Sequence, residues 1–232
     1  MEITEFVLRW IHFLAGITWI GMLYYFNFVQ TPFFGSELGG TAKGAMTRGL
    51  VPNALWWFRW GAMITFLTGW LIVLTKLGHE GMPLGSGYMT RILTGGLLGT
   101  LMWANVWFVI WPAQQVVIAN AERVAGGGQA DPTAAARGAR AGMSSRTNTL
   151  FSIPMLFFMA SASHLPSLAN EADTGAGVGL YWVAALIVML LVEANIFVGK
   201  AGTLKPLTTV SGTIHAGLGL TLVLLLLQVV LI

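Results

Sequence analysis

The chain has 232 residues, of which 56% are hydrophobic and only 9% are charged, and its mean hydropathy is +0.73. Soluble domains are about a quarter charged, so this composition predicts an integral membrane protein. Cysteine is absent, which excludes disulfide scaffolds, thiolate zinc sites, iron–sulfur clusters and haem attached through a CxxCH motif. The net charge is +3, but the 12 Lys and Arg residues are spread over the whole chain, so we expect no nucleic-acid binding.

Six apolar stretches are long enough to cross a bilayer, because a helix needs about 20 residues to span about 30 Å of hydrocarbon. They are residues 5–30, 54–77, 88–118, 146–165, 178–199 and 206–232. Residues 31–53 and 78–87 are rich in Gly and Pro, and residues 119–145 are the longest polar stretch, so all three are predicted to be loops. We therefore predict an all-α fold, a polytopic membrane helix bundle of about six helices that forms a single domain over residues 1–232.

The distribution of Lys and Arg residues along the chain predicts on which side of the membrane its two ends lie. Nine Lys and Arg residues fall on one side, against Arg9, Lys76 and Arg91 on the other. By the positive-inside rule the richer side is cytoplasmic, and an even number of helices then leaves both termini outside. The first apolar stretch is too long for a signal peptide and lacks a cleavage site, so we expect it to remain as a helix. The predicted location is the inner membrane of a bacterium.

Histidines are the main candidates for binding a cofactor, because the chain has no Cys and almost no acid within its predicted helices. His12 lies about 10 Å from the outer face and His215 about 16 Å from it. Gly16 and Gly219 follow these histidines by four residues, which leaves room for a flat macrocycle on each helix face. Imidazole is a common axial ligand of haem iron, so we predict a haem b held by His12 and His215. The alternative is that each is a hydrogen-bonding residue inside the bundle.

The other two histidines, His79 and His164, lie at the outer ends of predicted helices. They could bind a second cofactor or a metal ion, or they could be solvated interfacial residues. His164 is the alternative partner for the haem.

A second group of candidates is polar and lies toward the positive side of the membrane. Side chains from five predicted helices fall at one depth there, and buried polar groups in lipid need partners. A pocket lined by them would suit a planar, hydrogen-bonding or anionic molecule, such as a purine or a quinone headgroup. The alternative is that they are interhelical polar contacts and interfacial charges. The pocket residues are Asn27, Arg59, Asn105, Gln114, Arg146 and Glu193, and Glu193 is expected to pair with Arg59 or Arg146.

Four blocks of sequence resemble a known family. They are Arg-Trp-Ile-His at 9–12 with Gly-Ile-Thr-Trp-Ile-Gly at 16–21; Trp-Phe-Arg-Trp at 57–60 with Leu-Thr-Gly at 67–69; Ala-Asn-Val at 104–106 with Pro-Ala-Gln at 112–114; and Pro-Met-Leu-Phe-Phe-Met at 154–159 with Ser-His at 163–164. In this order, over residues 5–165, they resemble the N-terminal membrane domain of the membrane-bound urate oxidases (urate hydroxylases). The first block is also similar to membrane haem-b proteins of the protoporphyrinogen-oxidase and copper-resistance types.

This resemblance implies a membrane domain coupled to a C-terminal cytochrome c domain, which oxidises urate in purine catabolism and passes electrons to the respiratory chain. His12 and His164 match histidines of the family, whereas this chain has Leu93 and Thr147 where the family usually has two more. Because the chain has no Cys to attach a c-type haem, we expect it to lack the cytochrome domain.

Two functions follow from these expectations. The first is a membrane haem-b redox protein, an oxidoreductase if it is an enzyme, that passes electrons from the inner-side pocket to an outer acceptor such as a separate cytochrome c. The second is a non-catalytic accessory subunit of a larger membrane complex of the respiratory type, which the two missing histidines favour. A transporter has less support, because Glu193 is the only acid placed deeply in a predicted helix.

Overall fold

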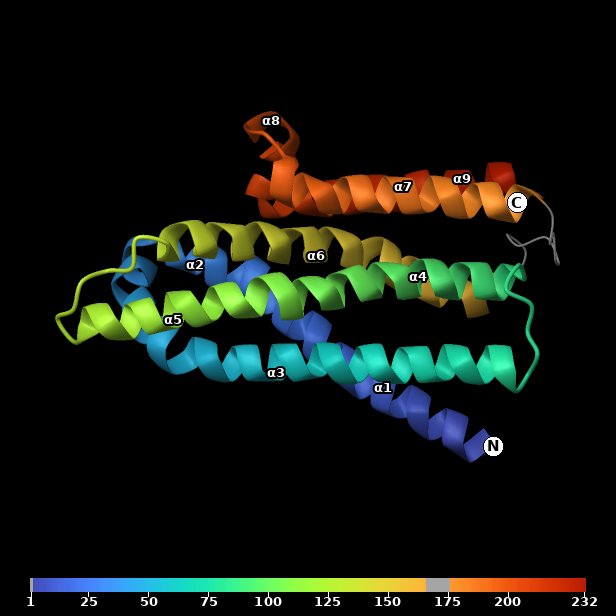
Figure 1. Cartoon of the computed structure of the whole chain (residues 1–232), viewed down its shortest axis with the longest axis horizontal. Coiled ribbons are helices and arrows are strands. Elements are labelled where there is room, and N and C mark those ends of the chain that lie inside the picture. The colour runs from blue at the N-terminus through green and yellow to red at the C-terminus, as the bar shows by residue number, and fades with distance from the viewer. Residues whose placement is uncertain (1, 166–175) are drawn as a thin grey trace.

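The computed structural model describes residues 2–165 and 176–232, and these residues form helices and short connections, with no strand among them. Several helices continue into one another to form long rods (Figure 1). The elements are α1 (Glu2–Tyr24), the π-helix η1 (Tyr25–Gln30) and α2 (Thr31–Phe34); α3 (Glu37–Gly78); α4 (Gly87–Ala104), the π-helix η2 (Asn105–Ile110) and α5 (Trp111–Ala125); α6 (Ala134–His164); α7 (Ala176–Val198); α8 (Ala201–Leu204) with the 3-10 turn η4 (Lys205–Thr208); and α9 (Val210–Leu231).

Five segments are long and apolar enough to cross a membrane. They are Ile3–Phe34, Glu37–Gly78, Gly87–Ala125, Gly177–Val198 and Val210–Leu231. The predicted all-α membrane bundle is therefore confirmed. The remaining predicted span, residues 146–165, belongs to α6, which is long enough but less apolar than the other five.

The polarity of α6 is explained by its place in the bundle. It packs against α1, α4, α5, α7 and α9, and Figure 1 shows it between the α4–α5 rod and the layer formed by α7 and α9. Many of its Ser, Thr and Asn side chains are fully buried among these neighbours rather than exposed to lipid, where they would be costly. They include Ser144, Thr147, Asn148, Thr149 and Ser152.

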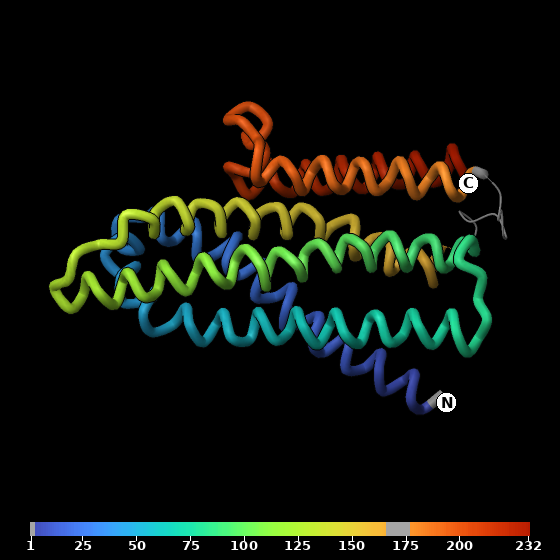
Figure 2. The backbone as a smooth tube through the Cα atoms, viewed as in Figure 1, coloured from blue at the N-terminus to red at the C-terminus, as the bar shows by residue number. Residues whose placement is uncertain are grey.

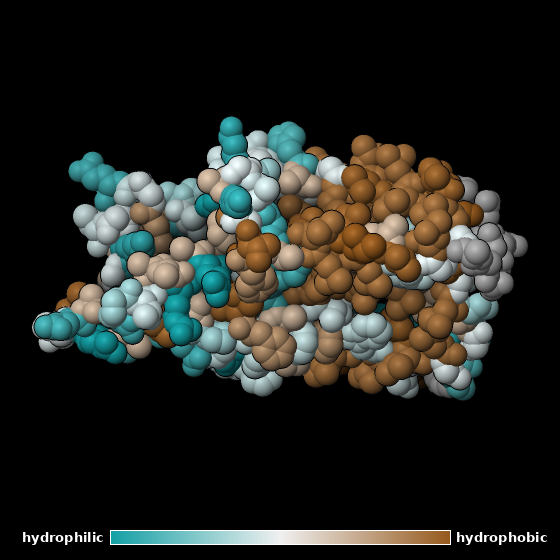
Figure 3. Space-filling model, turned by 45° about the horizontal axis from the view of Figure 1, so that its top comes forward, coloured by the Kyte–Doolittle hydropathy of each residue, from teal (hydrophilic) through white to brown (hydrophobic). Residues whose placement is uncertain are grey.

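The helices extend well beyond the membrane at one end of the molecule. With 42 residues, α3 is about 63 Å long, which is about twice the thickness of the hydrocarbon core. Figure 3 shows the consequence: on the face in view, one half is mainly hydrophobic, and the other half is mainly hydrophilic.

Two predicted loops are wrong because they lie in this polar extension. Residues 37–53 belong to α3, which begins where the Ser36 hydroxyl accepts the Gly39 N–H at 3.0 Å and continues through Pro52. Of residues 119–145, only 126–133 lie outside α5 and α6. The change from apolar to polar composition marks the membrane surface, and the helices continue beyond that surface.

Both termini lie at the same end of the bundle, together with the α3–α4 connection (Figure 2). The connections from α5 to α6 and from α7 to α9 lie toward the opposite, polar end. This arrangement matches the even number of crossings that the sequence predicts, while the side of the membrane on which the termini lie stays a prediction.

Two rods contain a π-helical segment at the point where they enter the polar half. Each segment ends two residues before a proline, Pro32 after η1 and Pro112 after η2. Proline lacks an N–H, and its ring clashes with the carbonyl four residues earlier, here Phe28 and Phe108. A wider turn relieves that clash while the helix continues. The sequence carries this signal as Phe-Val-x-x-Pro at 28–32 and again at 108–112.

Close packing of α9 on α6 gives a direct test of the fold. A Cβ added at Gly217 would lie 2.5 Å from Ile153 Cδ1 and 2.8 Å from the Leu150 carbonyl oxygen, whereas one added at Gly219 would meet nothing within 4 Å. We expect Gly217→Val to lower the free energy of unfolding by about 1–3 kcal/mol through overpacking. The thermal midpoint in detergent should fall for Gly217→Val and change little for Gly219→Val. Equal effects of the two substitutions would contradict this packing.

Candidate functional site

A cavity of about 1040 Å³ lies in the polar half of the bundle, enclosed by η1, α2, the first half of α3, α5 and the first half of α6. Its lining includes nine side chains that can donate or accept hydrogen bonds and contains no acidic residue. These nine are Asn27, Gln30, Thr31, Lys43, Thr47, Gln114, Asn120, Ser145 and Arg146. The cavity is therefore polar and positively charged, which favours an anionic ligand.

The π-helix η1 presents two amide side chains to this cavity, and both are at least nine-tenths buried. The Asn27 Nδ2 group donates to the Leu23 carbonyl oxygen at 2.9 Å and to the Ser145 hydroxyl at 2.8 Å, so this side chain is fixed. The Gln30 Oε1 atom is buried and has no hydrogen-bond partner in the described part of the chain. An unpartnered buried acceptor is costly, and a ligand N–H would satisfy it.

Two cations contribute to the cavity from opposite walls. Arg146 is half-buried on α6, where its Nη1 atom donates to the Leu207 carbonyl oxygen at 2.6 Å, which holds the guanidinium in place. Lys43 is exposed on α3, with its Nζ atom 6.0 Å from the centre of the Phe34 ring. Neither cation takes part in an ion pair within the described residues. Both charges are therefore available to a ligand.

Part of the cavity wall consists of glycine and alanine, and another part is aromatic. The small residues belong to α6 and α3, and they are Ala134, Ala135, Gly138, Ala139, Ala141, Gly142, Gly40 and Gly44. A Cβ added at Gly40, Gly44 or Gly142 would meet nothing within 4 Å, so these walls leave open space. Phe26 and Phe58 face the cavity from η1 and α3, and their rings meet edge to face at 5.5 Å. Such a space suits a planar ligand.

Three of the six pocket residues predicted from the sequence lie in this cavity, namely Asn27, Gln114 and Arg146. Lys43 was not among the predicted site residues, because residues 31–53 were predicted to be a loop and not part of a helix that lines the pocket. A helical spacing was nevertheless present there, since Gly40, Lys43, Gly44 and Thr47 recur at intervals of three or four residues, as on one face of a helix.

Asn105 and Glu193 belong to a separate buried network. The Asn105 Nδ2 group donates to Asn148 Oδ1 at 2.9 Å and to Glu193 Oε2 at 3.0 Å. Asn148 in turn donates to the Met102 carbonyl oxygen at 2.9 Å. The expected ion pair of Glu193 with Arg59 or Arg146 is therefore wrong: within the described residues this carboxylate accepts from a neutral amide and forms no ion pair.

Arg59 lies outside the cavity, in an aromatic cluster between α3 and the η2–α5 segment. Its Cζ atom is 3.9 Å from the centre of the Trp111 ring, 5.2 Å from that of Trp107 and 5.8 Å from that of Trp60. Cation–π contact with three rings accounts for its position. Because tryptophans concentrate at membrane–water interfaces, this cluster marks the level at which the rods leave the hydrocarbon.

The histidines predicted to hold a haem lie on different helix pairs. His12 is half-buried against α3, where its Nδ1 atom is 3.1 Å from the Thr68 hydroxyl and its ring fits over Gly69. His215 is exposed on α9, and its Nδ1 atom lies 2.7 Å from the Ser211 carbonyl oxygen of the same helix. In Figure 1, α1 and α9 lie on opposite sides of the bundle. His164 is exposed at the end of α6.

The structure therefore does not bring His12 and His215 around one cleft. No histidine of the described residues lines the polar cavity. Among residues 2–165 and 176–232, no group of three or more His, Asp or Glu side chains is placed to hold a metal ion.

Comparison with protein families identifies the chain. The model of the family described as urate oxidase N-terminal matches residues 74–223, which is more than half of the sequence. The chain belongs to the urate oxidase N-terminal domain family. The match extends further toward the C-terminus than the four blocks in residues 5–165, and it begins after His12 and after the part of α3 that lines the cavity. Neither a curated protein nor a solved structure gives a significant match.

The buried amide network of this urate oxidase N-terminal domain predicts a stability effect. In Asn105→Leu, the buried Asn148 oxygen and the half-buried Glu193 carboxylate lose their shared donor. We expect the free energy of unfolding to fall by about 1–3 kcal/mol. Chemical or thermal unfolding in detergent measures this change, with Asn53→Leu as the control because Asn53 is exposed and contacts only its own helix. If Asn105→Leu is no more destabilising than Asn53→Leu, the network does not support the fold.

Proposed function

We propose that this protein is a membrane component of a urate-oxidising system and that its polar cavity binds urate or a closely related purine anion. The observation that carries the proposal is the combination of two free cations, an unpartnered buried amide oxygen and no acid around one large space. Membership of the urate oxidase N-terminal family supports this class of ligand over other planar anions.

The chemistry of urate matches the cavity group by group. Urate is a planar purine that carries one negative charge at neutral pH and has both ring N–H donors and carbonyl acceptors. Lys43 and Arg146 supply charge-assisted hydrogen bonds to its oxygens, and the Gln30 Oε1 atom accepts from a ring N–H. Phe26 and Phe58 offer aromatic faces to the purine ring.

We infer that the cavity opens to the cytoplasm of a bacterium, across its inner membrane. The end of the bundle that contains the cavity also carries most of the Lys and Arg residues, so the positive-inside rule assigns that end to the cytoplasm and both termini to the periplasm. A cytoplasmic opening fits a ligand that arises from purine breakdown inside the cell.

A second candidate function is electron transfer through a haem b, and what supports it is the hydrogen bonding of single histidines, because no two of the predicted ligands share a cleft. A backbone carbonyl accepts hydrogen bonds, so His215 Nδ1 carries the proton that it donates to Ser211, and Nε2 keeps a free lone pair. His12 can do the same through the Thr68 hydroxyl. When bound, a haem would supply the one-electron chemistry that urate oxidation needs. His164 is the remaining histidine candidate for a second ligand, and without any haem the protein would act as a ligand-binding accessory subunit.

Calorimetric titration of the purified protein with urate tests the binding proposal. We expect Lys43→Gln to weaken urate binding at least about tenfold, because a charge-assisted hydrogen bond contributes about 1.5–3 kcal/mol. Arg48→Gln is the matched control, since Arg48 lies on the same helix, is exposed and is outside the cavity lining. The proposal fails if the unaltered protein does not bind urate, or if the control weakens binding as much as Lys43→Gln does.

Oxidised and dithionite-reduced visible spectra of protein expressed with added haem test the second candidate. Bound haem b gives sharp reduced bands, and we expect His215→Ala to remove them while His79→Ala keeps them, because no hydrogen bond within the described residues orients the His79 ring as Ser211 orients that of His215. Featureless spectra would exclude a bound haem and leave urate binding as the remaining proposed function. Haem retained in His215→Ala would exclude His215 as the ligand.

A further inference from the structure

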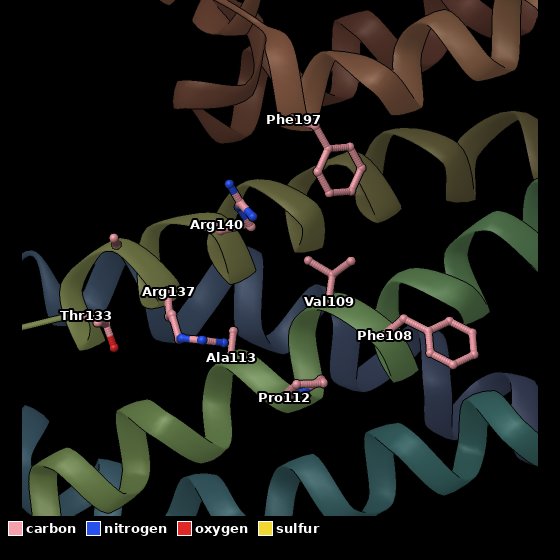
Figure 4. A pocket seen from close by; sticks show the side chains of 9 residues that line it. Phe108, Val109, Pro112, Ala113, Thr133, Arg137, Arg140 and Phe197 are labelled. Atoms are coloured by element: carbon pink, nitrogen blue, oxygen red, sulfur yellow. The ribbon is translucent and has the colours of Figure 1, made fainter. Parts of the chain in front are cut away.

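A second cavity, of about 390 Å³, lies on the outside of the bundle between the η2–α5 segment and the first half of α6, beside the end of α7 (Figure 4). It shares no lining residue with the urate cavity, because the two are formed by different faces of α6. We call it the arginine groove. Two arginines, Arg137 and Arg140, and the apolar side chains of Phe108, Val109 and Phe197 line it.

The two arginines present free positive charge to this groove. They are three residues apart on α6, so they share a helix face, and both are exposed. Neither forms an ion pair within the described residues, and the contact recorded for Arg140 is with the Phe197 ring, at 5.9 Å. The acid that precedes α6, Asp131, uses its Oδ1 atom to accept from the Thr133 N–H at 2.8 Å and hydroxyl at 2.7 Å. These hydrogen bonds, with the nearby charges of Arg123 and Arg137, lower the pKa of Asp131, but the carboxylate bonds to Thr133 and forms no ion pair with either arginine within the described residues.

The apolar side of the groove lies at the membrane surface. Phe197 is in the last turn of α7, the final part of the Gly177–Val198 membrane segment, and it is 50% exposed. Phe108, 70% exposed, is one residue from Trp107 in the cluster around Arg59 that marks the interface. In Figure 4 the arginines lie on the α6 side of the groove toward the polar end, and Phe108 and Phe197 lie toward the membrane half. The groove therefore crosses the membrane–water boundary.

We propose that the arginine groove binds an anionic phospholipid, with the headgroup phosphate between Arg137 and Arg140 and the acyl chains along Phe108 and Phe197. A phosphate accepts charge-assisted hydrogen bonds from guanidinium groups, and basic pockets on the cytoplasmic side of membrane helices are suited to anionic headgroups. The apolar residues distinguish this site from one for a free phosphate ion, which gains nothing from a phenylalanine at the hydrocarbon boundary. The inference is independent of the urate proposal.

Native mass spectrometry of delipidated protein in a neutral detergent, titrated with phosphatidylglycerol, tests this site. We expect one phosphatidylglycerol to bind with an affinity at least fivefold higher than that of phosphatidylcholine, and the Arg137→Gln/Arg140→Gln variant to lose that preference. The matched control is Arg48→Gln/Arg123→Gln, which removes the same charge from exposed positions at the same end of the molecule. Equal binding of both lipids overturns the proposal, as does inorganic phosphate that competes fully with the lipid. It is also overturned if the control pair loses the preference to the same extent.

A second measurement does not depend on the arginine variants folding. The chain has no Cys, so Ala136→Cys introduces a single thiol at an exposed position that lines the groove. A fluorophore on this thiol should be quenched by phosphatidylglycerol with a quencher on its headgroup, and much less by phosphatidylcholine carrying the same quencher. Equal quenching by the two lipids, or none by either, would show that no anionic lipid occupies the groove.

Discussion

The structure depends on keeping the polar side chains of α6 away from lipid. Asn148 illustrates the constraint: it is fully buried and satisfied by Asn105 and the Met102 carbonyl oxygen, which requires α4 and η2 to pack directly on α6. On another side of α6, Gly217 allows α9 to approach within contact of Leu150 and Ile153. Because neighbours cover α6 on several sides, it can carry Ser144, Thr147, Asn148, Thr149 and Ser152 in its middle without exposing them to the bilayer.

The same helix continues past the membrane, and this continuation creates both binding sites. Beyond the level of the Arg59 cluster, small residues on one face of α6 form a wall of the urate cavity, while Arg137 and Arg140 on another face form the arginine groove. The π-helical turn before Pro32 adds a residue to the helical turn and presents Asn27 and Gln30 to the cavity. A helix that was polar all round would be unstable in lipid, so the charged residues of both sites lie in the part of the bundle that projects into water.

The sequence predicted the parts of this architecture that follow from hydrophobicity. The apolar stretches predicted the membrane bundle, and Asn27, Gln114 and Arg146, which the sequence places at one depth, line one polar cavity. It could not predict that residues 37–53 are helical, because polar composition with Gly and Pro is typical of loops as well as of helix extensions outside the membrane. The partner of Glu193 was also missed: Coulomb attraction favours an arginine, but aromatic rings and the Leu207 carbonyl oxygen engage Arg59 and Arg146 instead.

The central claim is that an anionic purine occupies the cavity between η1, α3, α5 and α6. The most direct test is a structure of the protein determined with saturating urate in lipid nanodiscs. The account predicts flat density within hydrogen-bonding distance of Gln30 Oε1 and contacted by Arg146 and Lys43. Urate density elsewhere in the bundle, or a cavity that holds only water at saturating urate, would contradict it.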